Sequence, residues 1–353
     1  GSGLGHNIKR GNASASVEYK TEQGLLRAVD GVSFTLERGE SGGLVGESGC
    51  GKSTMAKALM RLLPDNGEIA SGQMLFQGQD LVTISKEEMR QHRLKDIAIV
   101  SQSAMNSLNP VYTVGRQIVE GLRAHTTMTR RQALKRAEEV FGMVGLEAKR
   151  LKNFPHQMSG GMKQRAIIAM ALSLNPALII ADEPTTALDV VVQDRILQRI
   201  VEIQKQVNSS MVFITHDISV VSEICENIIV MYGGKIMEKA SSEDFFRSPC
   251  HPYSLGLQNA FPSIGEMSEQ LISIPGSPPD LTEVQTGCRF KERCPFVQAL
   301  CHEEAPELAE YKKNHLVACH FCSEVQDFQD AAKRPETWAK VKDRLLQKRG
   351  RLS

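Results

Sequence analysis

The pattern of hydrophobic and polar positions predicts an α/β fold for most of the chain. Val32, Phe34 and Leu36 alternate with polar residues, as on a half-buried strand, and a glycine-rich turn follows them. A helix is predicted from about Lys52 to Leu63, because the chain then reaches Pro64, which cannot continue a helix. A strand, a tight turn and a helix therefore follow one another early in the sequence.

Short and uninterrupted apolar runs follow further along, and such runs are typical of strands buried in a parallel sheet. We predict strands at 96–100, 177–181 and 211–215, with a helix at about 190–207 between the last two. Apolar residues at helical spacing predict that residues 113–175 are largely helical, within a subdomain at about 105–175. Alternating strands and helices indicate an α/β domain into which this helical subdomain is inserted.

The composition is that of an ordinary globular protein. Of the 353 residues, 41% are hydrophobic and 24% are charged. The formal net charge of +1 gives no reason to expect a nucleic-acid partner. We find no apolar stretch long enough to cross a bilayer and no apolar signal core near the start.

The composition changes after about residue 260, which divides the chain into three predicted parts. Residues 16–260 form the α/β domain. A proline-rich linker and a cysteine-rich segment follow over 261–322, and a basic tail occupies 323–353. In that tail Trp338, Val341 and Leu345 are spaced to share one face of a helix.

The glycine-rich turn matches the pattern of a phosphate-binding loop, G-x-x-x-x-G-K-[ST]. Its glycines allow successive backbone N–H groups to point at phosphate oxygens, and the N-terminus of the following helix adds partial positive charge. Lys52 is expected to reach the β- and γ-phosphates of ATP, and the Ser53 hydroxyl to ligate Mg²⁺. The residues expected to bind the nucleotide here are Gly46, Ser48, Gly49, Cys50, Gly51, Lys52, Ser53 and Thr54.

Two carboxylates end the apolar strand at 177–181. Asp182 is expected to hold Mg²⁺, and Glu183 to polarise the attacking water. Adjacent acids also occur at solvated strand ends, but here they follow a buried strand in a chain that carries a phosphate-binding loop. Ligands bind beyond the carboxyl ends of such strands.

With these motifs the sequence resembles the ABC ATPase family. Met158-Ser-Gly-Gly-Met-Lys-Gln-Arg165 is similar to the family signature, with Met162 where Gln is usual. The resemblance implies that Ser159, Gly160 and Gly161 bind the γ-phosphate held by an opposite subunit. It also implies a P-loop NTPase fold, with a RecA-like core, an antiparallel β subdomain and a helical subdomain, plus a C-terminal cysteine-rich extension.

Four further residues match the family in the expected order. Gln102 resembles the glutamine that senses Mg²⁺ and water, and Asp189 belongs to a segment that resembles the D-loop. His216 resembles the switch histidine that contacts the γ-phosphate. Tyr19 has the spacing of the aromatic residue that stacks on adenine. In isolation, a histidine such as His216 is more often a hydrogen-bonded strand-end residue, and a tyrosine such as Tyr19 is more often a packing residue.

A narrower resemblance is to the ATPases of oligopeptide, dipeptide and nickel importers. It is carried by Val45–Thr54, Ser107–Pro110, Phe154–Ser159 and Cys250–Ser254. The resemblance implies a second, related ATPase in a heterodimer, two membrane permeases, an extracytoplasmic substrate-binding protein and a position on the cytoplasmic face of the membrane. Which solute is carried stays open. The alternative is a soluble ABC ATPase acting on ribosomes or DNA, a class that usually has two cassettes or a long coiled coil, and we find neither pattern.

Six of the eight cysteines lie between residues 250 and 322. Cys288, Cys294, Cys301 and Cys319 supply four thiolates, which suit either tetrahedral Zn²⁺ or a [4Fe–4S] cluster. Their spacing fits the habit of zinc sites poorly, and the family resemblance implies an iron–sulfur cluster; zinc and unligated thiols remain alternatives. Cys322 is left over, with the alternative that it replaces Cys319, and His315 is interpreted as a polar loop residue.

Overall fold

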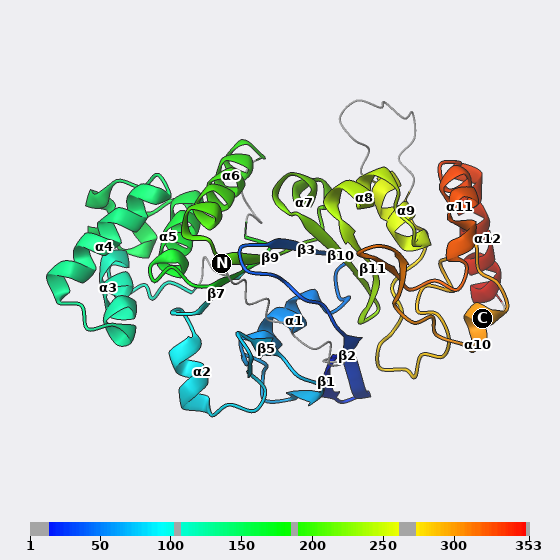
Figure 1. The fold of residues 1–353 in the computed structure, drawn as a ribbon, viewed down its shortest axis with the longest axis horizontal. Helices are drawn as coiled ribbons and strands as arrows, with labels where there is room; N and C mark the ends of the chain where they lie inside the picture. The colour runs from blue at the N-terminus through cyan, green and yellow to red at the C-terminus, as the bar shows by residue number, and fades with distance from the viewer. Residues whose placement is uncertain (1–13, 102–106, 185–189, 261–272, 351–353) are drawn as a thin grey trace, which may run out of the picture.

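The computed structural model describes residues 14–101, 107–184, 190–260 and 273–350. Within them the largest sheet has the strand order β12-β13-β11-β10-β3-β9-β8-β7 (Figure 1). The neighbours from β10 to β7 pair in parallel, whereas β11, β13 and β12 pair antiparallel. The strands are β3 (Ser41–Val45), β7 (Ile97–Val100), β8 (Leu178–Asp182), β9 (Ser210–Thr215), β10 (Asn227–Tyr232), β11 (Lys235–Ser241), β12 (Ala309–Lys312) and β13 (His315–Val317).

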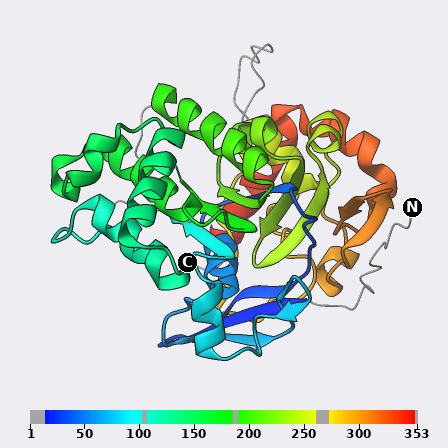
Figure 2. The same cartoon turned by 60° about the vertical axis from the view of Figure 1, so that its left-hand side comes forward.

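Two smaller antiparallel sheets lie on one side of the large sheet. Figures 1 and 2 both show the first, with strand order β2-β1-β4, below the large sheet together with α1, while α6 to α9 lie above it. The second is the pair β5 and β6. The bounds are β1 (Ala15–Thr21), β2 (Gly24–Val32), β4 (Gly67–Ser71), β5 (Leu75–Phe76) and β6 (Gln79–Asp80).

The helices from α3 onward form three groups along the sheet, whereas α1 and α2 lie below it (Figure 1). α3, α4 and α5 gather beyond β7, α6 to α9 cover one face, and α10 to α12 lie at the opposite end. The α-helices are α1 (Lys52–Leu59), α2 (Lys86–His92), α3 (Val114–His125), α4 (Arg130–Met143), α5 (Gly160–Leu172), α6 (Val190–Val207), α7 (Ile218–Ile224), α8 (Ser242–Arg247), α9 (Pro252–Ala260), α10 (Leu300–Glu303), α11 (Val325–Ala332) and α12 (Pro335–Gly350). The 3₁₀ helices are η2 (Ala148–Lys152), η3 (Pro155–Gln157) and η4 (Cys322–Glu324).

Polar residues at the helix ends explain several of these boundaries. The Thr129 hydroxyl accepts the backbone N–H of Gln132, whose side chain bonds back to the Thr129 N–H, so that α4 begins with a capping box. Thr113 caps α3 in the same way through its hydroxyl. The helix predicted to run to Leu63 ends earlier, at Leu59, because Arg61 adopts the left-handed conformation with φ of 48°.

The central strands are buried on both faces, which accounts for their uninterrupted apolar sequences. In β8, Ile179 belongs to the hydrophobic cluster on the face that carries the helical subdomain, whereas Ile180 belongs to the cluster formed with α1 and the small β-sheet. In β9, Phe213 and Val212 divide between the two clusters in the same way. The predicted strands at 177–181 and 211–215 are confirmed to within one residue at each end.

The C-terminal region packs against the sheet edge. β13 pairs with β11, so the hairpin of β12 and β13 extends the large sheet. The tail forms α12, and Trp338 and Val341 are buried along it at 2% and 1% exposure, as the spacing predicted. None of the helices in the described ranges is long and apolar enough to cross a bilayer.

Candidate functional site

Three adjacent parallel strands deliver the predicted catalytic motifs to one edge of the large sheet. β3 lies beside β9, and β9 beside β8, with Val45 opposite Thr215 and Asp182 opposite Ile214. Gly46, Glu183 and His216 directly follow the ends of these strands. Because the strands run parallel, their carboxyl ends meet in the crevice where open α/β sheets bind ligands.

The loop between β3 and α1 adopts a conformation that requires glycine. Gly46 and Gly51 have φ angles of 146° and 104°, and a Cβ atom added at Gly46 would lie 2.2 Å from the Met231 carbonyl oxygen. A Cβ at Gly51 would lie 2.3 Å from the carbonyl oxygen of Ala28. Ser48 and Gly49 are exposed at the tip. The loop therefore packs tightly at Gly46 and Gly51, while its tip at Ser48 and Gly49 stays open to a ligand.

Lys52 is held within this loop by its own backbone. Its Nζ atom donates to the carbonyl oxygens of Gly46 at 2.6 Å and Glu47 at 2.9 Å, and it lies 3.6 Å from the Cys50 sulfur. The side chain is only 6% exposed. The ammonium group is thus fixed beneath the position that the phosphate-binding pattern assigns to the β- and γ-phosphates.

The two predicted Mg²⁺ ligands are brought together. The Ser53 hydroxyl donates to Asp182 Oδ1 at 3.0 Å, although the two residues are 129 positions apart. Burial raises the pKa of the Asp182 carboxyl above its usual range, and the hydrogen bond from Ser53 opposes that shift. A hydroxyl and a carboxylate are the oxygen ligands that Mg²⁺ prefers, so this pair fits the ion.

Glu183 occupies a special backbone conformation beyond β8. Its φ angle is 47°, and its N–H donates to Ile214 O at 2.9 Å, which turns the side chain away from the strand direction. Glu183 Oε1 lies 3.0 Å from Nδ1 of His216, whose side chain is 59% exposed. A non-glycine residue in this region is uncommon and often marks a functional site. The two residues form an acid–imidazole pair at the open end of the sheet.

Tyr19 lies next to the first turn of the phosphate-loop helix. Its hydroxyl donates to Thr54 Oγ1 at 3.3 Å, and its ring packs closely against Gly67, where an added Cβ would lie 2.6 Å from the ring. The ring remains partly exposed. Tyr19 is therefore close to the loop that would hold the phosphates, as an adenine-stacking residue must be.

The signature serine caps a helix that belongs to the helical subdomain. The Ser159 hydroxyl accepts the Met162 N–H at 3.4 Å, and Ser159 and Gly160 are both exposed at the start of α5. Gly161, the next residue, is partly buried. This helix start, with its free N–H groups, faces solvent and can receive an anion from outside the chain. Gln102 and Asp189 lie outside the described residues.

The four cysteines predicted to bind a metal line one small cavity, together with Phe290 and Phe328. Cys288, Cys294 and Cys301 are 7–8% exposed and belong to the main hydrophobic cluster. Burial raises the pKa of Cys288 to about 11 and raises that of Cys294 further. Thiols in such surroundings stay protonated and pack as small apolar groups.

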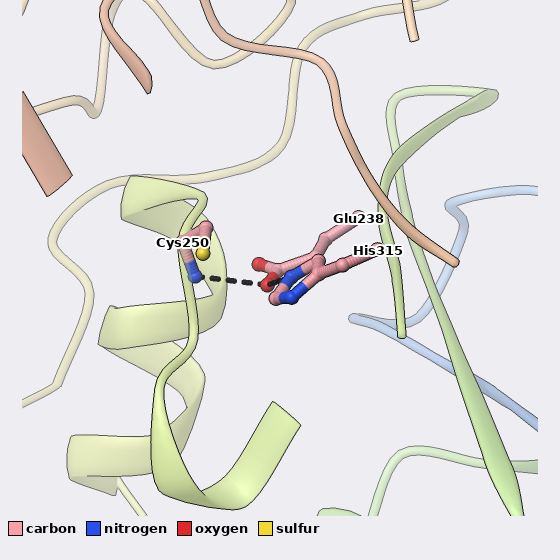
Figure 3. A group of neighbouring side chains, drawn as sticks. All are labelled: Glu238, Cys250 and His315. Atoms are coloured by element: carbon pink, nitrogen blue, oxygen red, sulfur yellow. Dashed lines mark hydrogen bonds and ion pairs between the residues drawn. The ribbon is translucent and has the colours of Figure 1, made fainter. Parts of the chain in front are cut away.

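A different group among the described residues has ligand atoms within 4.8 Å of one another: Glu238, Cys250 and His315 (Figure 3). All three side chains are buried. Glu238 accepts the N–H groups of Cys250 and His251 at 2.8 Å each, and His315 Nε2 lies 2.7 Å from Oε1. Both carboxylate oxygens of Glu238 therefore have protein partners. His315, interpreted from sequence as a loop residue, joins β13 to the α/β domain through this bond.

Sequence patterns missed two residues that contact the phosphate-binding loop. Arg293 forms a two-point ion pair with the Glu47 carboxylate, and the Tyr253 hydroxyl accepts the Glu47 N–H at 2.9 Å. Arg293 stands beside Cys294 in a segment that was interpreted only for its cysteines. The sequence offered no signal for this contact, because Arg293 stands in a charged stretch with Lys291 and Glu292 and its burial is seen only in the structure.

Comparison with known families and proteins agrees with this geometry. The profile of the ABC transporter family matches residues 29–186, and that of the oligopeptide/dipeptide transporter C-terminal region matches 237–301. Among curated proteins, the chain is 46% identical over 309 residues to the probable peptide ABC transporter ATP-binding protein y4tR of Sinorhizobium fredii, covering 86% of this chain and 92% of that one. It is 42% identical to the oligopeptide transport ATP-binding protein OppD of Bacillus subtilis, with 86% of each chain covered.

Solved structures share the fold of the ATPase portion. The ATP-binding cassette MJ0796, described as a post-hydrolysis dimer bound to ADP and Pi, is 29% identical with a TM-score of 0.59, covering 65% of this chain and 97% of that one. The cbiO1 protein of Clostridium perfringens, described as part of the ABC transporter complex cbiONQ, is 27% identical with a TM-score of 0.57, covering 67% and 92%.

These findings contradict the predicted [4Fe–4S] cluster. The relatives are described as ATP-binding proteins of peptide transport, and their descriptions name no iron–sulfur cluster. The ligand group found in the described residues is that of Glu238 and not the four cysteines, so the zinc alternative gains no support either. The physical reason is burial: Cys288, Cys294 and Cys301 pack among apolar side chains in the main hydrophobic cluster, whereas cysteine spacing alone suggested a ligand set.

Proposed function

This chain belongs to the ABC transporter family, and we propose that it is the ATP-hydrolysing subunit of an importer for peptides. The observation that carries the proposal is the convergence of Lys52, Ser53, Asp182 and the Glu183–His216 pair at the ends of β3, β8 and β9. The relatives named above are peptide-transport proteins, which favours this function over an ATPase acting on ribosomes or DNA.

Each side chain at this edge has a distinct proposed role. Lys52 binds the β- and γ-phosphates, and Tyr19 stacks on adenine. Ser53 and Asp182 hold Mg²⁺, which supplies charge neutralisation to the phosphates when bound. Glu183 orients and polarises the attacking water, and its contact with His216 supports that orientation.

The exposed signature helix supports a site completed by a second subunit. Ser159 and Gly160 are exposed at the start of α5, in the group of α3, α4 and α5, whereas Lys52 begins α1, which lies below the large sheet (Figure 1). We propose that two such ATPases, different chains in a heterodimer, associate head to tail so that each signature helix binds the γ-phosphate held by the other. ATP then favours the closed pair and ADP the open one, which is the differential affinity that drives a conformational cycle.

The remaining partners follow from the same proposal. Two permease subunits would span the membrane, a binding protein outside would supply the peptide, and this chain would sit on the cytoplasmic face. Gln102 and Asp189 would act at the Mg²⁺ site and across the dimer. The three parts of the chain, 16–260, 261–322 and 323–353, would be the ATPase domain, the linker with the cysteine-rich segment, and the basic tail.

The decisive experiment combines the Glu183→Gln variant with its partner ATPase and permeases in proteoliposomes. We expect ATP binding to persist while hydrolysis and peptide uptake fall by at least about 100-fold, the scale of a general base. Exposed Glu243→Gln on α8 serves as the matched control and should leave both rates unchanged. Turnover near the wild-type rate in Glu183→Gln would contradict the assignment of Glu183, and ATP-independent uptake would contradict the proposed function.

A further inference from the structure

The cysteine-rich segment makes a direct polar contact with the phosphate-binding loop. Arg293 is 2% exposed, and its Nη1 and Nη2 atoms donate to the two carboxylate oxygens of Glu47 at 2.5 and 2.8 Å. Such two-point pairs between arginine and a carboxylate fix orientation as well as distance. Glu47 directly follows Gly46 in the loop, so this ion pair joins residues 246 positions apart at the loop's first turn.

The remaining hydrogen-bond donors of Arg293 are also engaged. Nε donates to Pro275 O at 2.9 Å, Nη2 also donates to Ile274 O at 3.3 Å, and Nη1 lies 3.3 Å from the Tyr232 hydroxyl. A guanidinium has five N–H donors, and each has a partner here. The arginine is therefore locked in one position and can act as a rigid brace for Glu47.

The backbone of Glu47 is held at the same time. Its N–H donates to the Tyr253 hydroxyl at 2.9 Å, and its carbonyl oxygen accepts from Lys52 Nζ at 2.9 Å. Tyr253 is fully buried, and its ring packs against Tyr232 and Phe290 with centroid distances of 4.7 and 5.3 Å. Glu47 thus links the proposed phosphate-binding lysine to a rigid aromatic cluster and to Arg293.

We propose that Arg293 and Tyr253 are positioning residues for ATP: they hold Glu47, and through it the phosphate-binding loop and Lys52, in the conformation that receives the phosphates. The cysteine-rich segment thereby sets the affinity of the ATP site without touching the nucleotide. Because coupling between two sites is reciprocal, bound nucleotide must also stabilise the segment around Arg293. The inference rests on the proposed ATP site at Lys52.

The chain offers a matched control in the same segment. Arg289 also pairs with a carboxylate, donating from Nη2 to Asp30 Oδ2 at 2.6 Å, and its side chain is 9% exposed. Asp30 lies on β2 and not in the phosphate-binding loop. Arg289→Gln therefore removes a comparable ion pair between the C-terminal region and the α/β domain, but leaves Glu47 braced.

The test is a titration of the full-length chain with a fluorescent ATP analogue and Mg²⁺. Arg293→Gln and Glu47→Gln should each raise the Kd about tenfold, and the double variant should be no worse than either one, because contacting residues are not additive. Affinity for ADP should fall in parallel, since ADP also carries the β-phosphate. Arg289→Gln should stay within about twofold of the wild type. Tyr253→Phe, which removes only the hydroxyl, should raise the Kd several-fold and provides the test if Arg293→Gln does not fold.

Hydrogen exchange supplies a second readout that a merely structural role would not move. Nucleotide should slow amide exchange at 288–301 in the wild type but not in Arg293→Gln. The inference is overturned if Arg293→Gln, or Tyr253→Phe in its place, binds the ATP analogue as tightly as Arg289→Gln does. It is also overturned if all of these substitutions weaken ATP binding equally. A wild-type chain that binds no ATP would instead refute the proposed function, so the two failures are distinguishable.

Discussion

Replacing Glu238 by glutamine tests whether the buried carboxylate in Figure 3 joins the C-terminal region to the α/β domain. Glu238 is 0% exposed and receives the N–H groups of Cys250 and His251 and the imidazole of His315. A glutamine amide has one acceptor oxygen, so at least one of the three donors would face an NH₂ group and lose its partner. Glu238→Gln should therefore weaken the junction between β11, the loop before α9, and β13.

The magnitude follows from the contacts. An unsatisfied buried N–H costs about 1–3 kcal/mol, and the bonds that remain lose the help of the negative charge. Breaking one side of a buried charged group costs about 3–5 kcal/mol. We therefore expect Glu238→Gln to lower the free energy of unfolding by about 3 kcal/mol and the melting temperature by roughly 5 °C or more.

Calorimetry with and without a chelator provides the assay. The control is Glu243→Gln, since Glu243 pairs with Arg247 at 2.9 Å while both side chains are more than 70% exposed. That change should lower stability by less than about 0.5 kcal/mol. Equal effects of the two substitutions would refute the reasoning. A melting temperature that falls when a chelator is added to the wild type would show that a metal, and not hydrogen bonding alone, holds Glu238, Cys250 and His315 together.

Three further predictions concern the site and the core. Tyr19→Ala should weaken ATP binding by about 1–3 kcal/mol through lost base stacking, and an unchanged Kd in a nucleotide titration would return Tyr19 to a packing role. Ser159→Ala should leave ATP binding to the isolated chain intact but slow hydrolysis in the assembled transporter; isolated chains that hydrolyse at the full rate would contradict this. Burial lowers the pKa of His251 to about 4, below the value of about 6.5 in the unfolded chain. Stability is thus fully present above pH 6.5 and lost as the pH falls toward 4, by about 2 kcal/mol between pH 7.5 and pH 5. Denaturant unfolding of His251→Gln should show a smaller loss over that range.

Local patterns predicted much of the fold because the central sheet imposes strong constraints on sequence. A strand buried on both faces must be apolar throughout, so β8 and β9 were recognisable within one residue. Helix α6 was predicted over the same residues, 190–207, that it occupies. The end of α1 was not predicted, because no local rule places Arg61 in the left-handed conformation that ends this helix.

The glycines of β3 show what local patterns leave unexplained. Gly42 and Gly43 stand where larger apolar residues would ordinarily pack better in a buried strand. A Cβ atom on Gly43 would lie 2.0 Å from a methyl group of Val221, and one on Gly42 would lie 2.7 Å from Leu36. α7 thus approaches the strand that leads into the phosphate-binding loop so closely that only glycine fits at Gly43. That distance depends on helix–sheet packing and is not encoded in the neighbouring residues.

The sequence by itself determined the buried strands β7, β8 and β9, the helix α6 and the motifs that follow β3, β8 and β9, since backbone geometry and phosphate chemistry each demand particular residues at fixed spacing. It did not place the strand expected over Val32, Phe34 and Leu36, because β2 ends at Val32 and the next two residues of that pattern lie outside any strand. Tertiary structure alone decided which distant groups meet. It buried Cys288, Cys294 and Cys301 among apolar side chains, and it placed Arg293 against Glu47 and His315 against Glu238. Residues far apart in sequence leave no spacing pattern when they pair, because their contact depends on how the C-terminal region folds back onto the sheet.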